Sequence, residues 1–136
     1  MPQRAVFDTN ILVSAIGWSG NPRRCIELAR AGVITGLTCR EILEECWRVL
    51  ASKLQFTDEE ALSAVVDLLT VLQLVSIPHR LQFISADPAD DKVLECAVEG
   101  RATHIVTGDK KHLLSLGNYQ GIPIVSADDF LRNEIR

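Results

Sequence analysis

The chain has 136 residues, of which 47% are hydrophobic and 24% are charged, and its net charge at pH 7 is −4. This length and composition describe a single folded domain with one core, and they exclude a disordered chain. No apolar run reaches the roughly 18 residues that a membrane helix needs. Asp8 and Asn10 interrupt the segment in which a signal peptide would be apolar. We therefore expect one domain over residues 1–136, with no membrane partner and a cytoplasmic location.

The predicted elements alternate between apolar runs and helical patterns. In chain order we expect a strand at 4–7, helices at 9–16 and 21–31, a strand at 33–37, helices at 38–52 and 57–74, a weaker strand at 74–77, a helix at 88–100, a strand at 103–107, a helix at 109–116, a strand at 122–125 and a helix at 126–134. Such alternation is typical of the α/β class, with parallel strands covered by helices on both faces.

Capping signals mark several of the expected helix starts. A Ser, Thr or Asp side chain can accept a hydrogen bond from the first helical turn, and an acidic residue three positions later can return it. The pairs with this spacing are Thr38 with Glu41, Thr57 with Glu60 and Ser126 with Asp129, and Asp87 stands before Pro88. We expect each pair to begin a helix.

The cysteines form no metal-binding or disulfide pattern. Cys25, Cys39, Cys46 and Cys96 contain no CxxC pair, and the first three fall within or beside apolar helical stretches. Cysteines in such positions are usually small core residues. We therefore expect neither a thiolate metal site nor a disulfide framework.

Two aspartates stand where predicted strands end. Asp8 follows the run Ala5-Val6-Phe7, and Asp109 follows the strand 103–107 after a glycine. Each can be explained as a turn residue or a helix cap. In an open parallel sheet, however, ligands bind at the carboxyl ends of the strands. The position of both residues favours a role in a site.

A third carboxylate is selected by helical phase. At about 100° per residue, Glu45 lies at the edge of the apolar face of the helix 38–52, whereas Glu44 points to solvent. Glu41 is already explained as part of a cap. Glu45 is therefore the candidate site residue, although a solvated glutamate at the edge of the face gives the same pattern.

The fourth carboxylate is one of two neighbours. Asp90 falls inside the apolar stripe of the helix 88–100, and Asp91 falls at the margin of that stripe. A carboxylate within an apolar stripe needs a partner. Asp90 is the preferred candidate, and Asp91 remains the alternative, either as a supporting group or as a favourable first-turn residue.

A cation explains why such carboxylates would be brought together. Buried carboxylates repel one another and lose hydration unless a positive charge neutralises them. Oxygen ligands suit a hard cation, and the lack of matched His or Cys spacing argues against zinc. Without Asp8, Glu45, Asp90 and Asp109 the formal charge of −4 becomes zero, so the acidic balance is only weak evidence against a nucleic-acid substrate.

The basic and aromatic residues are less informative. Lys110 and Lys111, or Arg23 and Arg24, can contact a polyanion, but each pair equally describes a solvated helix face. His112 is a possible proton carrier. We expect the two tryptophans, Trp18 and Trp47, to pack in the fold rather than to stack on bases.

Four ordered segments resemble the PIN-domain family of metal-dependent nucleases. They are Val6-Phe7-Asp8-Thr9-Asn10-Ile11-Leu12-Val13-Ser14, Glu44-Glu45-Cys46-Trp47-Arg48-Val49-Leu50, Asp87-Pro88-Ala89-Asp90-Asp91-Lys92-Val93-Leu94 and Val106-Thr107-Gly108-Asp109. The resemblance runs from Asp8 nearly to Phe130 and is greatest to a compact bacterial and archaeal branch of toxins from toxin–antitoxin pairs. One departure is Cys39-Arg40, which stands where a Ser followed by an acidic residue is expected.

The resemblance implies a three-layer α/β/α sandwich with a twisted, mainly parallel sheet of 4–5 strands. It implies that Asp8, Glu45, Asp90 and Asp109 are the catalytic residues and coordinate Mg²⁺ or Mn²⁺, and that the enzyme is an endoribonuclease that hydrolyses single-stranded RNA. It also leads us to expect a small antitoxin partner and a homodimer. Two alternatives stay open: a phosphatase or phosphotransferase with Asp8 as nucleophile, and a module that binds RNA or protein without catalysis.

Overall fold

A parallel sheet forms the centre of the protein. The computed structural model describes residues 2–79, 90–109 and 111–134, and in these ranges the strands form one sheet of order β3-β2-β1-β4-β6-β5. The strands are β1 (Arg4–Phe7), β2 (Thr35–Thr38), β3 (Leu72–Leu74), β4 (His104–Val106), β5 (Asn118–Tyr119) and β6 (Ile122–Val125). All neighbouring strands pair in parallel except β5, which is antiparallel to β6. The predicted α/β class with a mainly parallel sheet is confirmed, and the short β5 was not anticipated.

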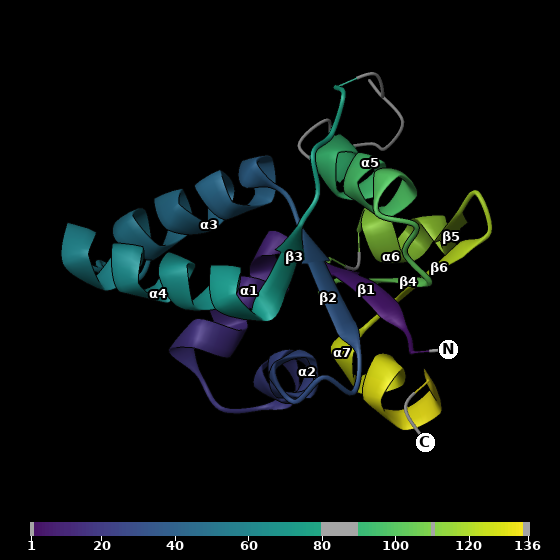
Figure 1. Ribbon diagram of the computed structural model, residues 1–136, viewed down its shortest axis with the longest axis horizontal. Coiled ribbons are helices and arrows are strands. Elements are labelled where there is room, and N and C mark those ends of the chain that lie inside the picture. Colours follow the sequence, from purple (N-terminus) through teal and green to yellow (C-terminus); the bar gives the residue numbers. More distant parts are fainter. Residues whose placement is uncertain (1, 80–89, 110, 135–136) are drawn as a thin grey trace.

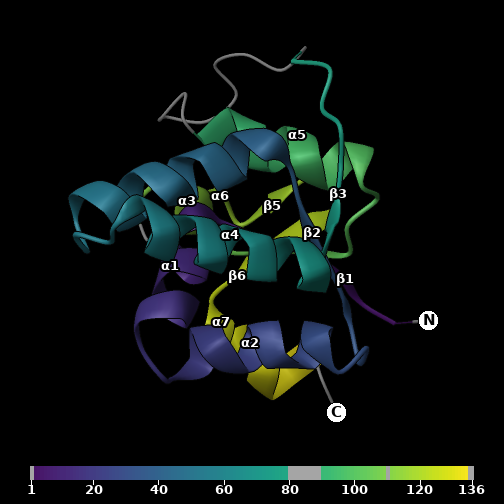
Figure 2. The ribbon, with the colours of Figure 1, turned by 60° about the vertical axis from the view of Figure 1, so that its left-hand side comes forward.

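Helices cover both faces of this sheet. They are α1 (Thr9–Gly17), α2 (Asn21–Arg30), α3 (Arg40–Ser52), α4 (Asp58–Val71), α5 (Asp91–Glu99), α6 (Leu113–Leu116) and α7 (Ala127–Asp129), the last continuing as a π-helical turn over Phe130–Glu134. Both views place α5 on one side of the sheet and α2 on the other (Figure 1, Figure 2). The helices α3 and α4 form an antiparallel hairpin that extends to the left of Figure 1. In the described ranges, no helix combines the length and the apolar character that crossing a membrane would require.

The strand β1 lies in the middle of the core. Ala5, Val6 and Phe7 are fully buried, because β1 is flanked by β2 and β4 and covered by helices on both faces. A continuous apolar run, rather than an alternating one, is what such a doubly covered parallel strand requires. Val6 pairs with Leu37 on β2 and with Ile105 on β4. This register brings the carboxyl ends of β1 and β4 together.

The start of α3 differs from the sequence prediction. Thr38 belongs to β2, where it pairs with Leu74 of β3, and its carbonyl accepts a hydrogen bond from the amide of Val75. Its backbone is therefore extended, and Cys39 takes the position before the helix without a side-chain cap. The predicted capping box of Thr38 and Glu41 is wrong, because strand pairing with β3 extends β2 by the residue that was expected to cap.

Two other predicted caps are present. Thr57 and Glu60 exchange hydrogen bonds at the start of α4 and form a complete capping box. Ser126 accepts from the amide of Asp129 at the start of α7. The helix predicted over 57–74 ends at Val71, since the next three residues form β3. The predicted cap at Asp87 and Pro88 lies outside the described residues.

The buried small and aromatic residues follow the prediction only in part. Cys25, Cys39 and Cys46 are buried, as expected of core residues, and Cys96 is buried as well. Trp47 packs against the core. Trp18, by contrast, is 60% exposed just beyond the end of α1, so the prediction that it packs in the fold is wrong.

Candidate metal centre

A cavity of about 450 Å³ opens at the carboxyl ends of β1 and β4. It is lined by Asp8, Glu45, Asp90 and Asp109, together with Thr9, Asn10, Val13, Ser14, Val49 and Lys53. The four carboxylates come from the end of β1, the middle of α3, the start of α5 and the segment after β4. The fold therefore brings together the four acidic residues that the sequence indicated.

Asp8 is the most firmly held of these carboxylates. It is buried, ends β1 and caps α1, and its Oδ1 accepts a hydrogen bond from the amide of Thr9 at 2.7 Å. Its Oδ2 accepts from the hydroxyl of Thr107 at 2.8 Å and from the side-chain Nδ2 of Asn10 at 3.2 Å. Burial raises the pKa of Asp8, and the nearby charge of Glu45 adds to this rise. The hydrogen bonds from Thr107 and Thr9 lower the pKa, but the net shift is upward. A cation in the cavity would relieve this cost.

Asn10 joins the two strand ends from the other side. Its Oδ1 accepts a hydrogen bond from the amide of Gly108 at 2.9 Å, while its amide nitrogen donates to Asp8. A Cβ at Gly108 would lie 3.3 Å from this oxygen, which is tighter than ordinary contact. The glycine therefore lets the segment after β4 pass close to the start of α1, and Asp109 lines the same cavity as Asp8.

Glu45 is linked to both neighbouring elements. Its Oε1 accepts a hydrogen bond from the hydroxyl of Thr9 at 2.5 Å. The same oxygen lies 3.1 Å from the Nζ of Lys92 on α5. Lys92 also lowers the pKa of Asp8 by its charge, although burial is the larger influence on that residue. Lys92 thus brings a positive charge close to these acidic groups.

The two neighbouring aspartates of α5 take different places. Asp90 and Asp91 are only 8% and 6% exposed. Asp90 lines the cavity, whereas Asp91 is not among the residues of the described chain that line it. This difference agrees with the preference for Asp90, and Asp91 is better placed as a supporting residue. Which of them binds a metal stays a prediction.

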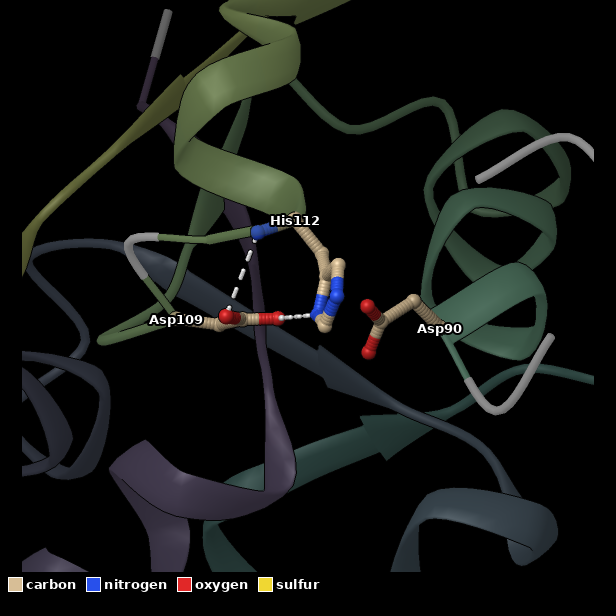
Figure 3. A group of neighbouring side chains, drawn as sticks. All are labelled: Asp90, Asp109 and His112. Carbon is tan, nitrogen blue, oxygen red and sulfur yellow. Dashed lines mark hydrogen bonds and ion pairs between the residues drawn. The ribbon is translucent and has the colours of Figure 1, made fainter. Parts of the chain in front are cut away.

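Asp109 is fixed by the turn that follows it. Its Oδ1 accepts hydrogen bonds from the amides of Lys111 and His112 at 3.2 and 3.3 Å, and its Oδ2 lies 3.3 Å from Nδ1 of His112. Burial acts to raise the pKa of Asp109, but the hydrogen bond from the His112 amide and the charge of its ring lower it overall. Figure 3 shows the imidazole of His112 between the carboxylates of Asp109 and Asp90.

Several residues of the site were not singled out from the sequence. Thr9, Thr107 and Lys92 hold the carboxylates in place, and Lys53 lines the cavity. Thr9 directly follows Asp8, Thr107 stands two positions before Asp109, and Lys92 directly follows Asp91, so closeness to the aspartates in the sequence was the available signal. The contact of Lys92 with Glu45 itself has no local signal, because it depends on the packing of α5 against α3.

Among the described residues, Arg23, Arg24 and Lys111 are not part of the lining of this cavity. The guanidinium of Arg23 donates to the carbonyls of Ala15 and Ile16 at the end of α1, and Arg24 donates to Asn21. Arg23 is thus a structural residue. Lys110 lies outside the described residues, and Lys111 is exposed.

The donor set of the cavity fits a divalent cation. One ligand atom each of Asp90, Asp109 and His112 lies within 4.8 Å of the others. Asp8 and Glu45 line the same cavity, so carboxylate oxygens predominate, as Mg²⁺ and Mn²⁺ require.

Comparisons with known proteins agree with this arrangement. The family model described as the PIN domain matches residues 4–111. The crystal structure of VapBC2 from Rickettsia felis bound to a DNA fragment from their promoter superposes with a TM-score of 0.64 and 16% sequence identity, and the match covers 90% of this chain and 98% of that chain. No curated protein matches the sequence. The resemblance seen in the sequence is confirmed, and the chain belongs to the PIN-domain family of nucleases.

Proposed function

We propose that this protein is a metal-dependent endoribonuclease that hydrolyses phosphodiester bonds of single-stranded RNA. The observation that carries the proposal is the convergence of Asp8, Glu45, Asp90 and Asp109 on one cavity. Four carboxylates from four separate segments are costly to assemble without a cation. Membership of the PIN-domain family supplies the reaction class.

The four carboxylates have separate roles in this proposal. Asp8, Glu45 and Asp90 hold the main Mg²⁺ or Mn²⁺, and Asp109 holds a second ion or orients the attacking water. A divalent cation in such a site acidifies a water molecule and neutralises charge on the phosphate. The chain's own contribution is to fix the oxygens in advance, through Thr9 on Glu45 and Thr107 on Asp8.

Lys53 is the basic side chain that lines the cavity in the described part of the chain. An ammonium group at the wall of an acidic cavity can bind a phosphate of the RNA backbone without neutralising the carboxylates. This arrangement suits a substrate that approaches along α1 and α3, which provide the neighbouring wall residues Ser14 and Val49.

The residue two positions after Asp8 argues against the phosphotransferase alternative. An enzyme that forms an aspartyl-phosphate on Asp8 is expected to have a second Asp two positions later. That position is Asn10, whose side chain bonds Asp8 and the backbone of Gly108.

A cleavage assay with matched variants tests the proposal. Wild type, Asp8→Asn, Asp90→Asn and Asp91→Asn are incubated with single-stranded RNA, double-stranded RNA and single-stranded DNA in Mg²⁺, Mn²⁺ or EDTA. We expect single-stranded RNA to be cut, EDTA to stop the reaction, and Asp8→Asn and Asp90→Asn to lose at least about a hundredfold in rate. Asp91→Asn should lose less than Asp90→Asn.

The control variant is Asp58→Asn, which replaces an exposed aspartate at the start of α4. It should cleave like wild type. RNA binding without turnover at any metal concentration would favour the non-catalytic module, and metal-dependent cleavage by Asp8→Asn at the wild-type rate would contradict the proposed centre. Preferential cutting of DNA would replace RNA as the substrate.

We also propose that a small antitoxin protein binds this nuclease and that the nuclease forms a homodimer. The resemblance to toxins of toxin–antitoxin pairs supports both the antitoxin and the dimer, and the fold shared with VapBC2 supports the antitoxin. Coexpression with any small reading frame adjacent to the gene tests the first. We expect a stable complex in which RNA cleavage is suppressed, and analytical ultracentrifugation of each species tests the dimer.

A further inference from the structure

His112 lies between Asp90 and Asp109, two of the carboxylates that line the cavity. One ligand atom each of His112, Asp109 and Asp90 lies within 4.8 Å of the others. Figure 3 shows the imidazole between the two acidic side chains. Because two atoms bound to one ion at about 2.0–2.2 Å are at most about 4.4 Å apart, only a small side-chain rotation is needed to bring all three onto one cation.

The separation of His112 and Asp109 is long for an ion pair. Their Nδ1 and Oδ2 atoms are 3.3 Å apart, whereas charge-assisted hydrogen bonds are usually about 2.7–2.9 Å. The same chain contains a tighter pair, in which Nε2 of His79 lies 2.6 Å from Glu41. The contact between His112 and Asp109 is therefore longer than the contact between His79 and Glu41, and it leaves room between the two side chains.

The turn keeps these two residues in position without that contact. The backbone amides of Lys111 and His112 hold Oδ1 of Asp109. The side chains of His112 and Asp109 are 34% and 22% exposed. A small rotation of either side chain can therefore move its ligand atom by a few tenths of an ångström. Asp90 is almost fully buried and provides the fixed side of the group.

We propose that Asp109 holds the second cation together with Asp90, which it shares with the main ion, that His112 is a nitrogen ligand of this second cation, and that this ligand makes the site prefer Mn²⁺ to Mg²⁺. The inference rests on the proposed metal centre and adds a ligand to it. Mg²⁺ is a hard ion that selects oxygen ligands, whereas imidazole nitrogen suits first-row transition metals. A site with two carboxylates and one imidazole should therefore bind Mn²⁺, a transition-metal ion, more tightly than Mg²⁺.

The decisive measurement is electron spin-echo spectroscopy of Mn²⁺ bound to the protein. A directly bound imidazole gives a ¹⁴N modulation, and the chain contains only 3 histidines, so ¹⁵N-histidine labelling changes that modulation specifically. We expect ¹⁴N modulation in unlabelled wild type, its replacement by ¹⁵N coupling on labelling, and its loss in His112→Gln.

Binding titrations give the second readout. We expect His112→Gln to weaken Mn²⁺ binding roughly tenfold or more and to change Mg²⁺ binding by less than about threefold. The matched control is His79→Gln, which removes a histidine paired with Glu41 rather than with the cavity acids. It should leave both affinities and the spectrum unchanged.

The outcomes separate this inference from the function on which it rests. Mn²⁺ binding without histidine coupling, or equal losses for Mn²⁺ and Mg²⁺ in His112→Gln, would overturn the nitrogen ligand and leave a proton carrier or hydrogen-bond donor as the role of His112. Failure of wild type to bind either ion would overturn the metal centre itself. Coupling that persists in His112→Gln but disappears in His79→Gln would also contradict the assignment.

Discussion

Thr107 donates its hydroxyl hydrogen to Oδ2 of Asp8 at 2.8 Å, although the two residues are 99 positions apart in the chain. The contact is buried and joins the carboxyl ends of β4 and β1. The same hydroxyl oxygen accepts a hydrogen bond from the amide of Asp109 at 3.0 Å. One threonine therefore positions two carboxylates of the proposed centre.

We expect Thr107→Val to lower the rate of RNA cleavage about 10- to 100-fold, as is typical when a supporting hydrogen bond to a metal ligand is lost. Valine keeps the shape of the side chain but cannot bind Asp8 or the Asp109 amide. Leaving these buried groups without the hydroxyl should also cost about 1–3 kcal/mol in the free energy of unfolding. Steady-state kinetics and urea denaturation measure the two effects.

Thr103→Val is the matched control for this variant. Thr103 stands just before β4, at the other end of the same strand pair, and its hydroxyl bonds to the backbone of Arg4. Its loss should reduce stability while the cleavage rate, measured on folded protein, stays within about twofold. Equal loss of activity in both variants would mean that Thr107 acts through general stability alone.

Lys92 provides a second test of the acidic cluster. Its Nζ lies 3.1 Å from Oε1 of Glu45, and its side chain is largely buried. Lys92→Met removes this positive charge, so the metal-free protein should become less stable and should gain more from a bound cation. We expect the Mn²⁺-induced rise in Tm to exceed that of wild type by roughly 3–6 °C, equivalent to about 1 kcal/mol.

Lys53→Met is the control, because Lys53 lines the same cavity but is exposed. Its metal-induced rise in Tm should stay close to that of wild type, while its affinity for RNA falls. A smaller Mn²⁺ effect in Lys92→Met than in wild type would show that Lys92 orients Glu45 for the metal rather than substituting for it. Scanning calorimetry in EDTA and in saturating Mn²⁺ makes the comparison.

The strand ends and helical phases explain why the four acidic residues could be found from the sequence. Asp8 and Asp109 each follow a short apolar run, and parallel strands place such residues at one edge of the sheet. Helical phase separated Glu45 from Glu44 because only one of them borders the apolar face. These are local properties, and a single sequence contains them.

The contacts between distant elements could not be found in the same way. The pairing of Lys92 with Glu45 depends on how α5 packs beside α3, and the bond from Thr107 to Asp8 depends on β4 lying next to β1. Strand order follows from the whole fold and leaves no local pattern. The exposed position of Trp18 is similar, since a tryptophan after a helix gives no signal of which surface lies beside it.

Thr38 shows how strand pairing can override a capping signal, and it gives a stability prediction. Its hydroxyl is buried and has no hydrogen-bond partner among the described residues. Valine has the same shape without the polar atom, so Thr38→Val should raise the free energy of unfolding by about 0.5–2 kcal/mol.

Thr57→Val, at the true capping box of α4, should lower the free energy of unfolding by about 1 kcal/mol. Urea denaturation of both variants checks the contrast, and destabilisation of Thr38→Val would show that the hydroxyl has a partner after all.

Glu41, freed from the predicted cap, instead ties the segment after β3 to the start of α3. Its Oε2 lies 2.6 Å from Nε2 of His79 and 3.6 Å from Arg40. Burial acts to raise the pKa of Glu41, but a hydrogen bond from its own backbone amide and the charge of His79 lower it overall. A carboxylate with a lowered pKa stabilises the fold above its ordinary value and loses that contribution as the pH falls through the lowered one.

We therefore expect Glu41→Gln to reduce the free energy of unfolding by about 0.5–1 kcal/mol near neutral pH. The difference from wild type should shrink as the pH falls below the ordinary value of 4.5, because wild type then loses the same contribution by protonation. Glu44→Gln is the matched control, since Glu44 is exposed on the same helix, and it should show little difference at any pH. Urea denaturation from pH 7 to pH 3.5 gives the curves. A difference that grows on acidification would mean that the pKa of Glu41 is raised in the folded protein and that the bridge to His79 does not stabilise it.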